Sequence, residues 1–227
     1  MQSPLANAKH WVFDLDNTLY PPGCNLFYQV DVRMREFIAK HFDIELDEAF
    51  KLQKRYFREY GTTLNGLMQV HGMKPEPFLN YVHDIDVSVI EPSPVLDRAL
   101  AKLPGKKIIY TNGSFDHAER ITNRLGIRDH FDNIFDIIAA DFRPKPDESA
   151  YHSLLSKYHI NPLETVMVED VAQNLEPAKK LGMATVLIHS GHRWSEDADG
   201  VDYVDHRIDD LTVWLSELVE EKSDGIA

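Results

Sequence analysis

The chain has 227 residues, of which 43% are hydrophobic and 27% charged, a composition that argues against extended disorder and low-complexity structure. It carries 37 Asp and Glu against 24 Lys and Arg, and this net charge of −13 would repel a polymeric nucleic acid or an anionic membrane. The single cysteine, Cys24, excludes an intrachain disulfide and fits a reducing compartment. We therefore expect a cytoplasmic protein with no nucleic-acid or membrane partner, as a monomer or homodimer.

Five short apolar runs predict strands that are buried on both faces. Helical spacing lies between the last four runs, and this alternation is typical of a parallel α/β sheet. A weaker run at residues 202–206 predicts an edge strand, and a last helix is expected over about residues 208–219. The five runs are residues 10–14, 107–111, 135–139, 165–169 and 184–189.

The helix expected before the fifth strand carries Leu175 and Leu181 on one face, and Gly182 is typical of its C-terminal end. Pro177 is compatible with a helix that begins near Asn174, because the first-turn N–H groups need no helical partner.

The segment 20–91 differs from the rest, because it has helical spacing throughout and no convincing strand. Proline pairs stand at both ends of this segment, as expected for two linkers. We therefore predict an α/β catalytic core made of residues 1–19 and 92–227, with an inserted, all-helical domain over residues 20–91.

Asp14 and Asp16 stand at the carboxyl end of the first predicted strand, where open α/β sheets bind their ligands. Residues two apart on an extended segment point the same way, so both carboxylates can address one centre. Two close carboxylates repel each other, which favours a hard cation such as Mg²⁺. One carboxylate is suited to be a nucleophile and the other a general acid and base. On this pattern alone, a strand that simply ends in polar turn residues remains the alternative.

Three later features follow the ends of other predicted strands. The hydroxyl of Thr111, with the backbone N–H groups after it, is suited to hold a phosphate, whereas Ser114 is more simply a helix N-cap. Lys145 lies between two prolines, which limit its backbone and suit a fixed ammonium facing phosphate and carboxylate. Glu169 and Asp170 end the fourth strand, where a carboxylate would complete a metal site.

Taken together, these motifs resemble the haloacid dehalogenase (HAD) superfamily. That resemblance implies a Rossmann-like parallel sheet with helices on both faces, and the segment 20–91 is similar to the superfamily's helical C1 cap. Residues 14–22, 55–64 and 81–84 resemble the pyrimidine 5′-nucleotidase branch more closely. The four superfamily motifs are matched in chain order by Asp14-x-Asp16-Asn17-Thr18, Thr111-Asn112-Gly113, Lys145-Pro146 and Glu169-Asp170-x-x-x-Asn174.

The resemblance implies that Asp14 attacks phosphorus to form an aspartyl-phosphate. Asp16 would protonate the leaving oxygen and then activate the hydrolytic water. Mg²⁺ would be held by a carboxylate oxygen of Asp14, the backbone carbonyl of Asp16 and Asp170. Asn17 stands where many members have glycine, and we expect it to adopt the positive φ of that turn.

The same resemblance implies that Thr111, the N–H of Asn112 and Lys145 bind the phosphoryl oxygens, with Lys145 also part of the catalytic group. Glu169 and Asn174 would lie beside the metal ligands, and whether Glu169 touches the metal is left open. Within the cap, the aromatic side chains either stack on a base or form the cap's own core, and Arg55 is either a ligand or solvated. The candidate specificity residues are Tyr20, Arg55, Tyr56, Tyr60, Thr62 and Thr63.

The sequence therefore predicts a Mg²⁺-dependent phosphatase of nucleoside 5′-monophosphates that prefers pyrimidines. The alternatives are a phosphatase of a sugar phosphate or phosphoglycolate, a phosphomutase, and a non-enzymatic phosphate-binding module. A dehalogenase is disfavoured because its chemistry has no leaving oxygen for Asp16 to protonate. No histidine pair has a zinc signature, and His189 and His192 either border the site entrance or lie on the surface.

Overall fold

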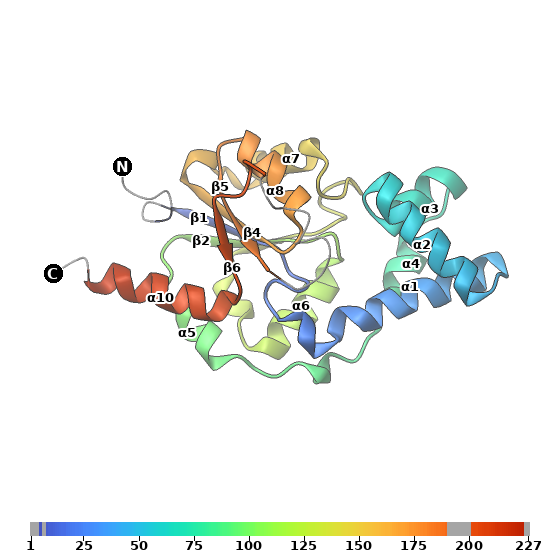
Figure 1. The fold of residues 1–227 in the computed structure, drawn as a ribbon, viewed down its shortest axis with the longest axis horizontal. Helices are drawn as coiled ribbons and strands as arrows, with labels where there is room; N and C mark the ends of the chain where they lie inside the picture. The colour runs from blue at the N-terminus through green and yellow to red at the C-terminus, as the bar shows by residue number, and fades with distance from the viewer. Residues whose placement is uncertain (1–4, 6–7, 190–200, 225–227) are drawn as a thin grey trace.

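The structure is a computed structural model that describes residue 5 and residues 8–189 and 201–224. Six parallel strands form one sheet in the order β3-β2-β1-β4-β5-β6, so β1 lies between β2 and β4 (Figure 1). The predicted fold class, a parallel sheet with helices on both faces, is confirmed. The strands are β1 (His10–Phe13), β2 (Lys106–Tyr110), β3 (Asn133–Phe135), β4 (Thr165–Glu169), β5 (Ala184–Ile188) and β6 (His206–Ile208).

Neighbouring residues of each strand pack on opposite faces of the sheet. In β1, Trp11 and Phe13 join one buried cluster, and Val12 joins the other. The helices α5 (Pro94–Lys102), α6 (Phe115–Leu125) and α10 (Leu211–Asp224) cover the first face. The helices α7 (Glu148–Tyr158) and α8 (Ala172–Lys180) cover the second face. Both faces of the sheet are thus covered by helices, which explains why the strand sequences are continuous apolar runs.

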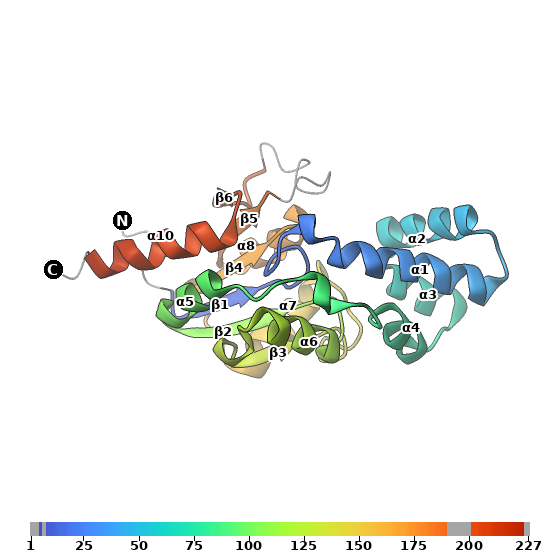
Figure 2. The ribbon, with the colours of Figure 1, turned by 90° about the horizontal axis from the view of Figure 1, so that it is seen from below.

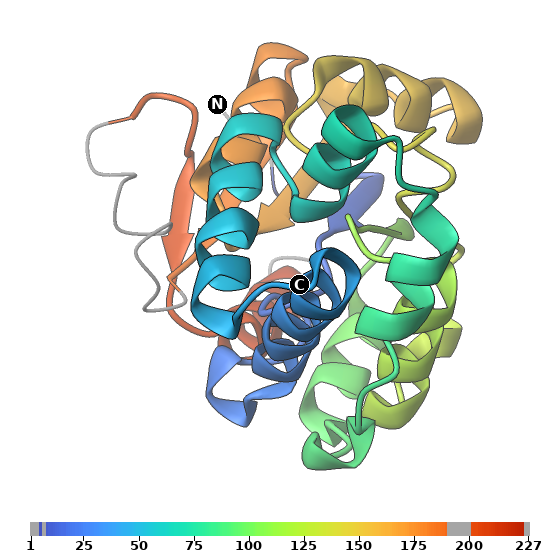
Figure 3. The same cartoon turned by 90° about the vertical axis from the view of Figure 1, so that its right-hand side faces the viewer.

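Within residues 20–91 the chain forms four α-helices and no strand, as the spacing predicts. They are α1 (Leu26–Phe42), α2 (Leu46–Tyr60), α3 (Thr63–His71) and α4 (Pro75–Val82). These four helices, here called the cap helices, lie at the end of the molecule opposite to α10 (Figures 1 and 2). Figure 3 looks onto them with the strands behind. The exact boundaries of the cap, at residues 20 and 91, stay a prediction.

The connection from α4 back to the core is fastened to α6 by two arginines. Arg120 donates to the carbonyls of His83 (2.8 Å) and Ile85 (2.7 Å). Arg124 donates to the carbonyl of Ile90 (2.7 Å). Among the described residues, no helix has the length and apolarity needed to cross a membrane.

Four sequence expectations about elements are wrong. The third strand is Asn133–Phe135 rather than 135–139, because the Asp136 carboxylate accepts hydrogen bonds from the N–H groups of Phe115 (2.9 Å) and Ala139 (2.8 Å) and turns the chain. The edge strand is His206–Ile208 rather than 202–206, and the last helix begins at Leu211 rather than near residue 208.

The fourth error concerns α8, which begins at Ala172 rather than near Asn174, so Pro177 lies inside the helix. The chain turns into the helix directly after Asp170, and the N–H of Asn174 already bonds to the carbonyl of Val171 (3.0 Å). Gly182 does follow the helix, with a φ of 95°, as expected for a C-terminal stop.

Candidate active site

Polar side chains gather at the carboxyl edge of the sheet, where neighbouring parallel strands end together. Asp14 follows β1, Thr111 follows β2, and Glu169 and Asp170 stand at the end of β4. Lys145 reaches the same place from the loop after β3. All five are buried, with Lys145 only 2% exposed. The structure therefore brings together the core residues that the four motifs predict.

Lys145 is the centre of a buried ionic cluster. Its Nζ donates to Asp14 Oδ1 (2.6 Å), Glu169 Oε1 (2.6 Å) and the carbonyl of Tyr110 (3.0 Å). The Asn112 side chain fixes the lysine from behind, because its Oδ1 accepts the N–H of Lys145 (2.8 Å). Burial alone would lower the pKa of Lys145, but Asp14 and Glu169 raise it, so the ammonium stays charged.

Asp14, Glu169 and Asp170 form a cluster of carboxylates with more negative charge than one lysine neutralises. Each offers one oxygen, and these oxygens lie within 4.8 Å of one another. Burial raises the pKa of Asp14 to about 7, although Lys145 acts in the opposite direction. Burial and the neighbouring Glu169 raise the pKa of Asp170 well above its usual value. The donor set fits a hard divalent cation, because oxygen ligands and a deficit of positive charge are what such an ion requires.

Glu169 uses both of its carboxylate oxygens on protein donors. Oε1 accepts from Lys145 and from Asn174 Nδ2 (2.7 Å), and Oε2 accepts from the N–H of Val171 (2.8 Å). Asp170 has no such set of donors in the described chain, so it is the better placed of the two to ligate a metal directly.

The Asp16 carboxylate contacts two side chains that the sequence analysis did not place beside it. Tyr20 donates its hydroxyl to Asp16 Oδ1 (2.5 Å), and His117 Nε2 lies 2.9 Å from the same oxygen. Burial alone would raise the pKa of Asp16, but His117 and Tyr20 lower it. Asn17 has a φ of 60°, which confirms the expectation for the turn that presents Asp16.

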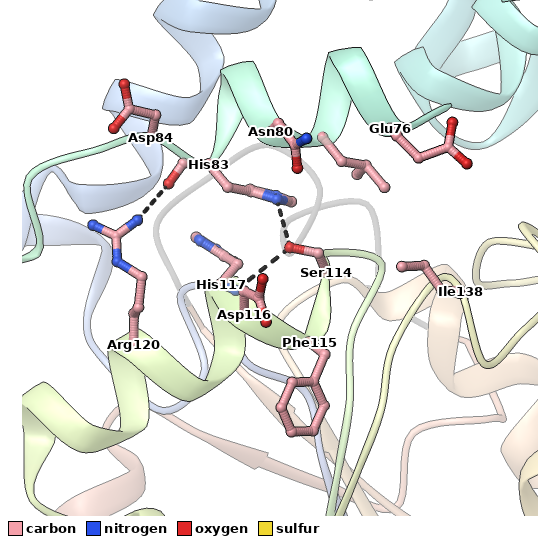
Figure 4. A pocket seen from close by; sticks show the side chains of 11 residues that line it. Glu76, Asn80, His83, Asp84, Ser114, Phe115, Asp116, His117, Arg120 and Ile138 are labelled. Carbon is pink, nitrogen blue, oxygen red and sulfur yellow. Dashed lines mark hydrogen bonds between the residues drawn. The ribbon is translucent and has the colours of Figure 1, made fainter. Parts of the chain in front are cut away.

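His83 and His117 form a stacked pair beside this carboxylate, with ring centroids 4.2 Å apart. His83 Nδ1 lies 2.9 Å from Ser114 Oγ (Figure 4). Burial and the neighbouring His117 lower the pKa of His83 to about 3, so this ring is neutral. The pair borders a cavity of about 330 Å³ between α4 and α6, here called the smaller cavity. Ser114 is the N-cap of α6, as predicted.

A second cavity, of about 760 Å³ and here called the larger cavity, lies between the carboxyl edge of the sheet and the cap helices. Its core wall contains Asp14, Asp16, Thr111, Asn112, Lys145, Glu169, Asp170 and Asn174. The Thr111 hydroxyl, which accepts the N–H of Gly113 (2.9 Å), keeps its own hydrogen for a ligand.

The cap wall of the larger cavity differs in part from the candidate specificity set. Thr62 and Thr63 line it, whereas Tyr20, Arg55, Tyr56 and Tyr60 do not. The residues of α2 that line it are Gln53, Lys54, Phe57 and Arg58.

Helix geometry explains the difference for Arg55 and Tyr56. Positions 53, 54, 57 and 58 fall on one face of a helix with 3.6 residues per turn, and positions 55 and 56 fall elsewhere. Tyr56 is buried within the cap, with its hydroxyl 2.6 Å from His71 Nε2. The periodicity of α2 marks this face, but which face meets the core depends on the tertiary arrangement.

The sequence left open whether His189 and His192 border the site entrance or lie on the surface. His189 is exposed directly after β5 and does not line the larger cavity. His192 lies outside the described residues.

Comparison with known proteins gives three kinds of match. A sequence model described as haloacid dehalogenase-like hydrolase matches residues 8–182. The chain is 28% identical to phosphate metabolism protein 8 of Saccharomyces cerevisiae, over 91% of this chain and 69% of that protein. It is 29% identical to glyceraldehyde 3-phosphate phosphatase of Methanocaldococcus jannaschii, over 88% of this chain and 92% of that protein. A solved HAD phosphatase from Thermococcus onnurineus matches with a TM-score of 0.61 at 20% identity, over 94% of this chain and 97% of that one, which shows the fold alone.

Proposed function

Since the chain belongs to the haloacid dehalogenase-like hydrolases, we propose that it is a Mg²⁺-dependent phosphomonoesterase that forms an aspartyl-phosphate on Asp14. The observation that carries this proposal is the burial of Asp14 and Lys145 together beside Asp16, at the wall of the larger cavity. Phosphate-ester hydrolysis is among the slowest uncatalysed reactions, so a nucleophile, a proton carrier and fixed positive charge at one point suit it. Both curated relatives described above carry names from phosphate metabolism, which supports the same chemistry.

In the first half of the reaction, a carboxylate oxygen of Asp14 attacks phosphorus while the bond from phosphorus to the leaving oxygen breaks. Asp16 gives its proton to that oxygen, so the product leaves as an alcohol. A phosphate ester brings negative charge beside Asp16, and a nearby like charge favours the protonated carboxyl needed here. Lys145 and the Thr111 hydroxyl face the phosphoryl oxygens and offset their charge.

In the second half, Asp16 takes a proton from water as the water oxygen attacks phosphorus. The bond from Asp14 to phosphorus breaks, inorganic phosphate leaves, and Asp16 is again protonated. Mg²⁺, when bound by Asp14, Asp170 and the backbone carbonyl of Asp16, would supply further positive charge at the transferred group. The cap helices exclude bulk water, which strengthens these electrostatic contacts.

For the substrate, we propose nucleoside 5′-monophosphates with a preference for pyrimidines. The larger cavity has a volume within the range of small-molecule sites. Phe27 and Phe57 on its cap wall are suited to stack on a base, and Arg58 adds a cation. The similarity of residues 14–22, 55–64 and 81–84 to the pyrimidine 5′-nucleotidase branch supports the preference. We further propose a cytoplasmic enzyme with no nucleic-acid polymer or membrane as a partner.

The second candidate is a phosphatase of another small metabolite. The observation that favours it is the 29% identity to a protein named for its action on glyceraldehyde 3-phosphate, over nearly the whole of both chains. Thr62 and Thr63 on the cap wall are suited to hydrogen-bond the hydroxyl groups of such a substrate.

A panel assay tests these proposals. The purified protein with Mg²⁺ is given UMP, CMP, AMP, glyceraldehyde 3-phosphate and phosphoglycolate, and released phosphate is measured. We expect the highest kcat/KM for UMP and CMP, and an Asp14→Asn loss of at least about 10³-fold. Asp209→Asn, which changes an exposed aspartate outside the larger cavity, is the matched control. An Asp14→Asn variant that still turns over overturns the mechanism, and equal kcat/KM across the panel overturns the pyrimidine preference.

A further inference from the structure

We propose that Tyr20 and His117 are positioning residues, which hold one oxygen of Asp16 so that its other oxygen carries the proton to the leaving group. This inference rests on the proposed phosphatase function, because it assigns a task to the carboxyl group that serves as general acid there. Neither residue belongs to the motifs that resemble the superfamily's catalytic set.

The contacts of Asp16 are one-sided. Tyr20 and His117 both bond to Oδ1, at 2.5 Å and 2.9 Å, and no described residue bonds to Oδ2. The Tyr20 and His117 side chains are 2% and 1% exposed, whereas the Asp16 side chain is 16% exposed. Asp16 lines the larger cavity and its two partners do not. Tyr20 and His117 therefore act on a substrate in the larger cavity only through Asp16.

This arrangement decides where the proton of Asp16 resides. A carboxyl oxygen offers two lone-pair sites, and with His117 in its Nε2–H tautomer the two donors occupy both sites of Oδ1. A proton on the carboxyl group then lies on Oδ2, the oxygen to which no described residue bonds. The two bonds also prevent a rotation that would exchange the oxygens, so Oδ2 is already held as the proton-carrying oxygen when the substrate arrives.

Both positioning residues are themselves fixed, and each is linked to one of the two connections between core and cap. Tyr20 lies in the connection that leads from β1 to α1. His117 stacks on His83, which follows α4 and is held by Ser114 and Arg120 (Figure 4). The two residues that hold the Asp16 carboxyl group are therefore each linked to a different connection between core and cap.

Two aryl esters that differ by one nitro group test the proposal. The phenolate of p-nitrophenyl phosphate leaves without a proton much more readily than that of phenyl phosphate. We expect Tyr20→Phe and His117→Leu to lower kcat/KM for phenyl phosphate by about 10- to 100-fold and for p-nitrophenyl phosphate by less than about threefold, because only the poorer leaving group needs the acid. KM should change little. His117→Gln keeps a side-chain N–H donor and should recover most of the loss.

Matched controls come from elsewhere in the chain. His130 Nε2 lies 2.6 Å from Asp97 Oδ1, and Tyr158 donates to the carbonyl of Ile134 at 3.3 Å. His130→Leu and Tyr158→Phe should affect both esters equally or not at all. If His117→Leu fails to fold, as judged by circular dichroism, Tyr20→Phe decides, because it removes one hydroxyl and keeps the ring.

The outcomes are distinct. An equal loss on both esters, or no loss on either, overturns the positioning role while the phosphatase function stands. A wild-type protein that hydrolyses neither ester nor any substrate of the panel overturns the proposed function, and the positioning role with it.

Discussion

At the scale of single residues, the site depends on one buried ammonium among carboxylates. Lys145 and Glu169 are both almost fully buried and lie 2.6 Å apart. The surface pair Lys9 and Glu164 has the same separation, but its side chains are 66% and 33% exposed. Desolvation makes a broken buried pair costly, whereas solvent screens the exposed pair, so equal geometry has unequal consequences.

We therefore expect Lys145→Met to lower the free energy of unfolding by about 3–5 kcal/mol, because it leaves carboxylates buried without a partner. Urea denaturation at neutral pH measures this change. Lys9→Met, the matched control, should leave the unfolding midpoint unchanged. Mg²⁺ should restore part of the loss in the Lys145 variant, since it supplies positive charge at the same cluster. Equal effects of the two variants would contradict the importance of this buried cluster.

At the scale of elements, the side chain of Asp205, directly before β6, adds contacts to β5 beyond the backbone pairing of the two strands. The carboxylate accepts from the N–H of Thr185 (2.9 Å), from the Thr185 hydroxyl (3.1 Å) and from Lys179. Burial alone would raise the pKa of Asp205, but Lys179 and Thr185 lower it. A lowered pKa means that the folded state favours the carboxylate form.

Asp205→Asn should therefore reduce the free energy of unfolding by about 1 kcal/mol at pH 7. The stabilisation is present above the unfolded-state pKa, about 3.9, and is lost as pH falls through the lower folded-state value. The difference between wild type and variant should stay constant from pH 7 to pH 5 and shrink below about pH 4, in urea titrations. Glu148→Gln at an exposed ion pair is the control. A difference that grows toward acid would contradict the assignment.

Strands were predicted correctly where an apolar run is covered on both faces of the parallel sheet. The runs at β1, β2, β4 and β5 are apolar and covered on both faces, so each strand lies within one residue of its predicted limits. In the run 135–139, Ile137 is buried in a turn made by Asp136, and Ile138 is 54% exposed. A short apolar run alone therefore does not distinguish a turn from a buried strand.

The same reasoning explains which site residues could be predicted. Asp14, Thr111, Glu169 and Asp170 stand at strand ends, which parallel topology places at one edge. His83 and His117 belong to the cap connection and to a helix, and only the packing of α6 beside that connection brings them to Asp16. The lining face of α2 likewise depends on how the cap rests on the core.

At the scale of the whole molecule, the net charge of −13 coexists with a cavity that holds Lys54, Arg58 and Lys145 on its walls. An anionic substrate therefore meets local positive charge within an acidic protein. The clustered carboxylates of Asp14, Glu169 and Asp170 place their negative charge deep in the same cavity, where a cation can offset it.

Metal binding should thus be visible in the stability of the intact protein. Mg²⁺ in place of EDTA should raise the midpoint of thermal unfolding, by the equivalent of about 2.7 kcal/mol at 100 times its Kd. Asp170→Asn should raise the midpoint in EDTA, because it removes one of three crowded carboxylates, and should abolish the Mg²⁺-dependent shift. The exposed Asp209→Asn should keep that shift. A full shift in the Asp170 variant would show that the cation binds elsewhere.

The helices α1–α4 lie in one uninterrupted stretch of chain between β1 and β2. This placement affects how the cap can be exchanged by recombination. The cap wall of the larger cavity is encoded by a single segment of the gene, whereas the residues proposed for the chemistry are distributed over the segments on either side. Recombination with two breakpoints would exchange the whole wall and leave Asp14, Thr111, Lys145 and Asp170 in register. Tyr20 and His83 lie where such joins would fall. The core would therefore keep its activity with an exchanged cap only if both joins preserve these two side chains.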